Sequence, residues 1–82
     1  MTPALVAADT PTGTLTVLAG NGRVVACRNA RAYEVGDGDL IVVSNQGRRY
    51  VWAAGEWAAV GTLERTDGLA WVAIERFAGE AA

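Results

Sequence analysis

Short runs of alternating hydrophobic and polar residues recur along most of this chain, and glycine-containing turns separate them. Residues 14–19 alternate threonine with leucine or valine, which is the period-two pattern of a half-buried strand. Residues 20–22 read Gly-Asn-Gly, and Asn-Gly between two such runs is a strong β-hairpin signal. We therefore expect a hairpin whose return strand covers residues 23–28.

The same punctuation predicts further strands downstream. A strand is expected over residues 39–44, and its continuous apolar stretch Leu40–Val43 predicts burial on both faces. Turn residues bound three more expected strands, and residues 29–38 are left as the longest connection. The three later strands are expected over residues 48–54, 57–64 and 69–77.

About six short strands at spacings of roughly 8–12 residues are typical of an all-β sandwich or barrel. A two-sheet sandwich is tight for 82 residues, whereas closing a sheet on itself removes its exposed edges. The pattern therefore favours a small five- or six-stranded barrel of the OB or SH3-like kind. No stretch shows a helical stripe of apolar residues.

The barrel is expected over residues 14–77, with an N-terminal arm over residues 1–13 and a C-terminal tail over residues 78–82. The arm contains both prolines of the chain, and proline favours extended backbone while removing a hydrogen-bond donor. Two interpretations remain open for it. It is either a disordered tail or an extended arm that docks on a neighbouring subunit through Leu5 and Val6.

Composition adds an argument for association. The chain has 82 residues, of which 51% are hydrophobic, yet a domain this small buries only about 60% of its unfolded surface. Either the core is unusually rich or another chain covers part of the surface. The formal net charge of −2 argues against a nucleic-acid partner. All seven basic residues are arginine, which fits coding bias from a GC-rich genome better than selection for bidentate contacts.

The chain contains few residues that could serve in catalysis or bind a metal ion. Histidine is absent, and Cys27 is the single cysteine. An internal disulfide therefore lacks its second cysteine, and a zinc site lacks a set of ligands. Neither a Ser-His nor a Cys-His pair is available, and we expect a non-enzymatic protein without a cofactor or a small-molecule substrate. Residues 36–39 read Gly-Asp-Gly-Asp, but the rest of a calcium loop is missing, so they predict a turn.

Aromatic residues raise the main ambiguity about function. Arg48 and Arg49 precede Tyr50 and Trp52, and arginines beside aromatics on a barrel strand could track single-stranded nucleic acid. Since Tyr50 and Trp52 share one face of the strand, we expect both on the core face instead.

Six aromatic residues are more than one small core must hold. We therefore expect Trp57 and Trp71 on an exposed face as interface residues, because tryptophan is common at interfaces.

Three segments of the chain read GTLTVLAG over residues 13–20, AYEVGDGDLIVV over residues 32–43 and GRRYVWAAGEW over residues 47–57. Together they resemble a small β-barrel module of actinobacteriophage minor tail and related virion proteins. The resemblance covers the chain from Thr14 to about Thr62. It implies a non-enzymatic structural protein of the phage tail, tail tip or head–tail connection. Its expected partners are other virion proteins and copies of itself.

The alternative hypothesis is a barrel that binds single-stranded nucleic acid through the arginines and exposed aromatics. An accessory subunit of an enzyme is a third, and no sequence feature distinguishes it. The N-terminus lacks the charged and apolar regions of a signal peptide, and no stretch approaches the ~18 apolar residues of a membrane span. The expected location is the virion, assembled in the host cytoplasm, with no membrane contact.

Overall fold

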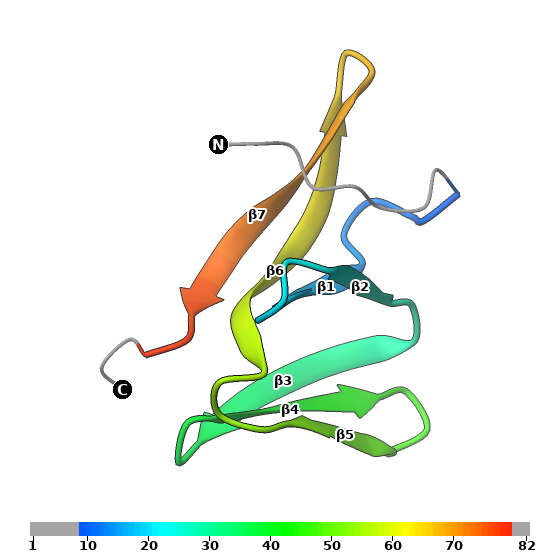
Figure 1. The fold of residues 1–82 in the computed structure, drawn as a ribbon. Helices are drawn as coiled ribbons and strands as arrows, with labels where there is room; N and C mark the ends of the chain where they lie inside the picture. Colours follow the sequence, from blue (N-terminus) through cyan, green and yellow to red (C-terminus); the bar gives the residue numbers. More distant parts are fainter. Residues whose placement is uncertain (1–8, 80–82) are drawn as a thin grey trace.

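Turns built on glycine or Asp-Gly divide the chain into seven strands in the computed structural model, which describes residues 9–79 (Figure 1). The all-β prediction is confirmed, although the strand count is not the expected five or six. Residues 30–36, predicted as part of a connection, form a strand of their own. The strands are β1 (Leu15–Ala19), β2 (Val24–Cys27), β3 (Ala30–Gly36), β4 (Asp39–Ser44), β5 (Arg49–Trp52), β6 (Trp57–Thr66) and β7 (Leu69–Phe77).

The described strands form two antiparallel sheets rather than one closed ladder. One sheet has the order β2-β1-β6-β7 and the other has the order β3-β4-β5. The second sheet is a simple meander, whereas β6 returns from it to pair with β1 (Figure 1). A β-bulge lies in the β6–β7 ladder between Val60 and Gly61.

The hairpin predicted at residues 20–22 is confirmed, with one local difference. The amide of Ala19 donates to the carbonyl of Arg23 at 2.8 Å, and the amide of Gly22 donates to the carbonyl of Ala19 at 3.0 Å. This is a three-residue loop, in which the positive φ of 88° falls on Gly22 alone. Asn21 contributes its side-chain oxygen, which accepts a hydrogen bond from the amide of Arg23.

Asp-Gly pairs make the two tightest turns. Asp37 and Gly38 have φ values of 55° and 84°, and Asp67 and Gly68 have 54° and 80°. Positive φ at both central residues defines the type I′ turn, whose twist matches that of the flanking strands. The turn predicted at residues 36–39 is therefore confirmed, and it joins β3 to β4.

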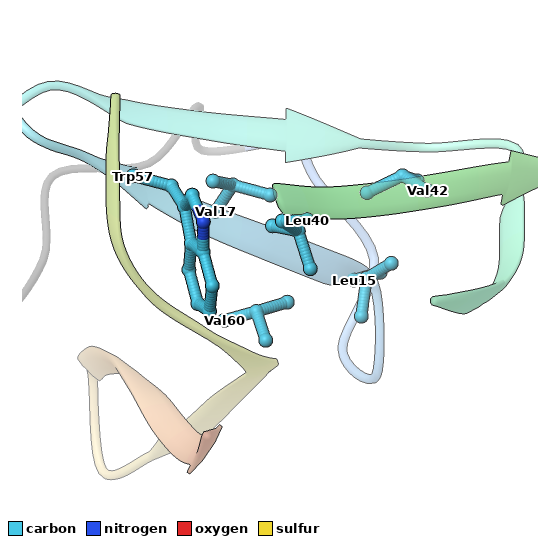
Figure 2. Packing of buried hydrophobic residues seen from close by; sticks show 6 residues of the cluster. All are labelled: Leu15, Val17, Leu40, Val42, Trp57 and Val60. Carbon is cyan, nitrogen blue, oxygen red and sulfur yellow. The ribbon is translucent and has the colours of Figure 1, made fainter. Parts of the chain in front are cut away.

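The core lies between the two sheets. β1 supplies Leu15 and Val17, β4 supplies Leu40 and Val42, and β6 completes it with two residues (Figure 2). The largest core side chain is Trp57, which is 2% exposed, and its Nε1–H donates to the carbonyl of Gly38 at 2.9 Å. The prediction of an exposed Trp57 is therefore wrong, because its indole closes one end of the core.

The prediction that β4 is buried on both faces is also wrong. Leu40 and Val42 are fully buried, whereas Ile41 and Val43 are only half-buried. The reason is that the three-stranded sheet has the core on one side and no described element packed on the other. The apolar run of β4 thus combines a core face with an apolar outer face.

The described ends of the predicted arm and tail contact the folded strands. Thr10 is buried, and the amide of Gly13 donates to the carbonyl of Leu63 at 2.7 Å. At the other end, the amide of Ala78 donates to the carbonyl of Ala58. The predicted interface residues Leu5 and Val6 lie outside the described residues.

Candidate interaction groove

A groove of about 880 Å³ opens between β2 and the β4–β5 hairpin. Its apolar part is formed by Val25 and Cys27 of β2, Val42 of β4 and Trp52 of β5. Val42 belongs to the buried core, and Cys27 and Trp52 pack against that core. The floor of the groove therefore consists mainly of side chains that belong to the core or pack against it.

The chain path explains why the groove exists. β2 pairs with β1 on one side, then passes through Arg28 and Asn29 into β3, which belongs to the other sheet. The amide of Asn45 donates to the carbonyl of Asn29 at 2.6 Å and fixes this corner. Neither β2 nor β5 pairs with a described strand on its second side, so two free strand edges border the groove.

Backbone polar groups point away from the sheet at both edges. The amide of Ser44 donates to the carbonyl of Arg48, so in this antiparallel ladder the amides and carbonyls of Arg49 and Val51 face outward. In the β1–β2 ladder the alternation starts from the bond between Ala19 and Arg23. It leaves the backbone amide and carbonyl of Ala26 on β2 facing outward. Such edges can accept a further strand.

The rim of the groove is cationic although the whole chain is acidic. Arg28, Arg48 and Arg49 line it, and no aspartate or glutamate does. Arg28 pairs with Asp9 at 2.7 Å, and this contact lowers the pKa of the Asp9 carboxyl through a hydrogen bond and charge attraction.

The second pair joins Arg49 to Glu34 at 2.8 Å, and both pairs are exposed. Exposed ion pairs of this kind contribute little to stability. A carboxylate of a partner can therefore replace the Asp9 or Glu34 carboxylate beside the arginine. Arg48 forms no ion pair within residues 9–79.

The placement of Tyr50 differs from the prediction. Tyr50 and Trp52 do share a face of β5, opposite Val42 and Leu40. However, Tyr50 is 52% exposed, because the core ends beneath Trp52 and Tyr50 stands on the groove rim. The prediction that both aromatics are core residues is thus wrong for Tyr50.

The two predicted interface residues that lie within residues 9–79 have different surroundings. Trp71 is half-buried on β7 and does not line the groove, and Trp57 belongs to the core. The groove was missed at the sequence level because its two sides lie far apart in the chain. The available signal was Arg48 and Arg49 beside an aromatic pair.

A smaller cleft of about 340 Å³ lies on the other side of the corner, between β3 and the β6–β7 ladder. The Tyr33 hydroxyl donates to the Glu75 carboxylate at 3.0 Å across it. This bond links the two sheets. The phenol and the carboxylate of this cleft are therefore bonded to each other.

Titratable groups near the groove do not form a reactive arrangement. Burial raises the pKa of the Cys27 thiol, so Cys27 is a neutral thiol at pH 7 rather than a nucleophilic thiolate. Asp39 accepts a hydrogen bond from the amide of Ala54 at 2.9 Å, which gives it a structural role. Residues 9–79 hold no cluster of three or more metal-ligating side chains. They also contain no helix with the length and apolarity needed to cross a bilayer.

No family model, no curated protein and no solved structure matches this chain.

Proposed function

We propose that this protein acts by assembly, as a non-enzymatic structural protein of a tailed phage particle. The observation that carries the proposal is the open groove with its two free strand edges. An apolar floor, a charged rim and unpaired backbone groups are what a docking segment of another protein requires. The resemblance of the stretch from Thr14 to about Thr62 to phage virion modules directs the assembly hypothesis to the tail, tail tip or head–tail connection.

Exposed apolar side chains on edge strands support the same proposal. Tyr50 and Val51 on β5 are 52% and 62% exposed, and Leu69 and Phe77 on β7 are 60% and 51% exposed. Both strands are sheet edges, where natural proteins usually place lysine or proline to block unwanted pairing. This chain has no lysine, so its edges are fit for covering by neighbours.

The strand arrangement also supports a partly open barrel. β2 and β3 behave as one strand bent at Arg28 and Asn29, with β1 beside its first half and β4 beside its second half. A bent strand shared between two sheets lets a small sheet curl on itself. We propose a small, partly open barrel of the OB or SH3-like kind on this basis.

Mass spectrometry of gradient-purified particles from the encoding phage tests the proposed role. Peptides of this chain are expected in the particle fraction at a constant ratio to the major tail proteins. A chain found only in the soluble fraction of infected cells would overturn the proposal. Particles washed at high salt serve as the control for loosely adsorbed protein.

A second candidate function is binding of single-stranded nucleic acid, and the exposure of Tyr50 favours it. Tyr50 stands beside Arg48 and Arg49, which provides one stacking surface with two cations. A mobility shift with a single-stranded DNA oligonucleotide that weakens with salt would support it. An Arg23→Glu variant, altered at an exposed arginine outside the groove, is the matched control for Arg48→Glu.

A further inference from the structure

The outer half of the β6–β7 hairpin extends beyond the other labelled strands (Figure 1). Its tip is a two-residue turn, Asp67-Gly68, and every residue from 65 to 69 is exposed. Leu69 is 60% exposed and is the largest apolar side chain on this tip; it pairs with Thr66 at the end of the ladder, and Asp67 lies in the turn between these two residues. The tip therefore presents an apolar side chain and the Asp67 carboxylate at its turn, with the Arg65 guanidinium further down β6.

The groove has the complementary chemistry. Its floor is apolar, which suits Leu69, and its rim carries Arg48, which has no ion-pair partner in the described chain and suits Asp67. β7 pairs with no described strand on its outer side, and its backbone there can pair with the outward backbone groups of Arg49 and Val51 on β5. These three matches concern apolar contact, charge and backbone hydrogen bonding, and each is independent of the others.

We propose that the β6–β7 hairpin tip of one copy of this chain docks in the β2–β5 groove of a second copy. This proposal rests on the proposed assembly function and specifies the contact through which two copies associate. A peptide-like partner fits better than a nucleic acid. One exposed tyrosine is too few for successive stacked bases, and a net charge of −2 repels a polyanion.

The tip and the groove are different surfaces, so the contact is head-to-tail. Contacts of this type continue from copy to copy, and they produce a ring if the rotation closes or a filament if it does not. A hairpin tip in a groove buries a small area, so a single contact belongs to the weak class of interfaces. Repetition around a ring would strengthen it through avidity.

Sedimentation velocity over a range of protein concentrations tests the contact. Wild type is expected to form species larger than a dimer as concentration rises. Asp67→Asn should weaken association about fivefold and Leu69→Thr roughly tenfold, given the usual effects of one exposed charge pair and one buried leucine. Arg48→Glu should weaken it more than Asp67→Asn, because it places like charges opposite each other.

Matched controls separate this contact from general charge or folding effects. Asp37→Asn makes the same change in the same type of turn on the β3–β4 hairpin, and Arg23→Glu reverses an exposed charge outside the groove. Neither control should alter association. Asparagine also adopts positive φ readily, so both turn variants should keep their fold, as circular dichroism would verify.

A mixing experiment gives the sharpest result. A tip variant, Asp67→Asn/Leu69→Thr, retains a working groove, and a groove variant, Arg48→Glu/Tyr50→Thr, retains a working tip. Each variant alone should be monomeric. Their mixture should form a one-to-one dimer and nothing larger, because only one intact groove can meet one intact tip.

Three outcomes would overturn the contact: a monomeric wild type at high concentration, controls that weaken association as much as the test variants, or a mixture that stays monomeric. A monomeric wild type whose single-stranded DNA shift is lost in Arg48→Glu would assign the groove to nucleic acid. Presence in purified particles together with a monomeric wild type would reject this contact. Assembly with other virion proteins would still stand.

Discussion

The substitution Gly61→Ala tests how closely β6 and β7 approach at their bulge. A Cβ atom on Gly61 would lie 2.2 Å from the carbonyl oxygen of Ala73 and 2.8 Å from the Cα of Ile74. Real Cβ atoms essentially never come within 3.0 Å of another atom, and both of these neighbours belong to the backbone of β7. The strand must therefore move by most of an ångström to accept one methyl group.

The expected cost follows from two contributions. Overpacking at a tight site typically costs 1–3 kcal/mol, and displacing β7 weakens about one ladder hydrogen bond worth roughly 1 kcal/mol. Gly61→Ala should thus lower the free energy of unfolding by about 2–4 kcal/mol. With a urea m-value of about 1 kcal/mol per molar for a small domain, the midpoint should fall by about 2 M or more.

Gly36→Ala on β3 is the matched control. A Cβ there meets no atom within 4 Å, and the backbone of Gly36 is not in the left-handed region. Removing glycine at such a site usually stabilises by about 0.4–1 kcal/mol through the unfolded chain. Urea unfolding followed by circular dichroism measures both variants. A Gly61→Ala protein as stable as wild type, with an unchanged m-value, would refute the close approach of the two strands.

Three further predictions concern Trp57, Cys27 and Asp9. Trp57→Ala should lower the free energy of unfolding by about 3–5 kcal/mol in urea unfolding, since it removes the largest side chain of the core and leaves a cavity. Burial raises the pKa of Cys27 above 9.0, so its share of stability is complete below pH 9.0 and is lost as pH rises through the folded-state value. Urea unfolding on both sides of that pH should show a smaller loss in Cys27→Ala. The pKa of Asp9 should lie below 3.8 in an NMR titration, and Arg28→Gln should return it towards 3.8.

Local patterns predicted the strands where turn chemistry was explicit. The strands over residues 39–44 and 69–77 have the expected bounds, since Asp-Gly pairs precede both of them. β3 was missed, although Asp37-Gly38 is as clear a hairpin signal as Asn21-Gly22. The reason is that exposed polar residues on both faces, such as Arg31 and Glu34, interrupt any apolar run.

Burial was harder to predict than strand position, because it depends on neighbours far along the chain. Trp57 is buried by packing in the core against residues of β1 and β4, and its indole N–H donates to the carbonyl of Gly38 on another hairpin. Tyr50 is exposed because no described strand follows β5 at the edge of its sheet. The groove has the same origin. It requires the β2–β3 corner and β5 to be placed in space, which period-two patterns cannot do.

The pairing of β6 with β1 also sets an order of events in folding. β2, β3, β4 and β5 all lie between these two partners in the sequence, whereas every other pairing joins consecutive strands. Consecutive hairpins form within about 1–10 μs, while a distant pairing must first close a long loop. The β1–β6 ladder is therefore expected to form last and to limit the folding rate. On the ribosome, β1 and β2 must wait with their apolar face open until the segment from Trp57 onward has been made.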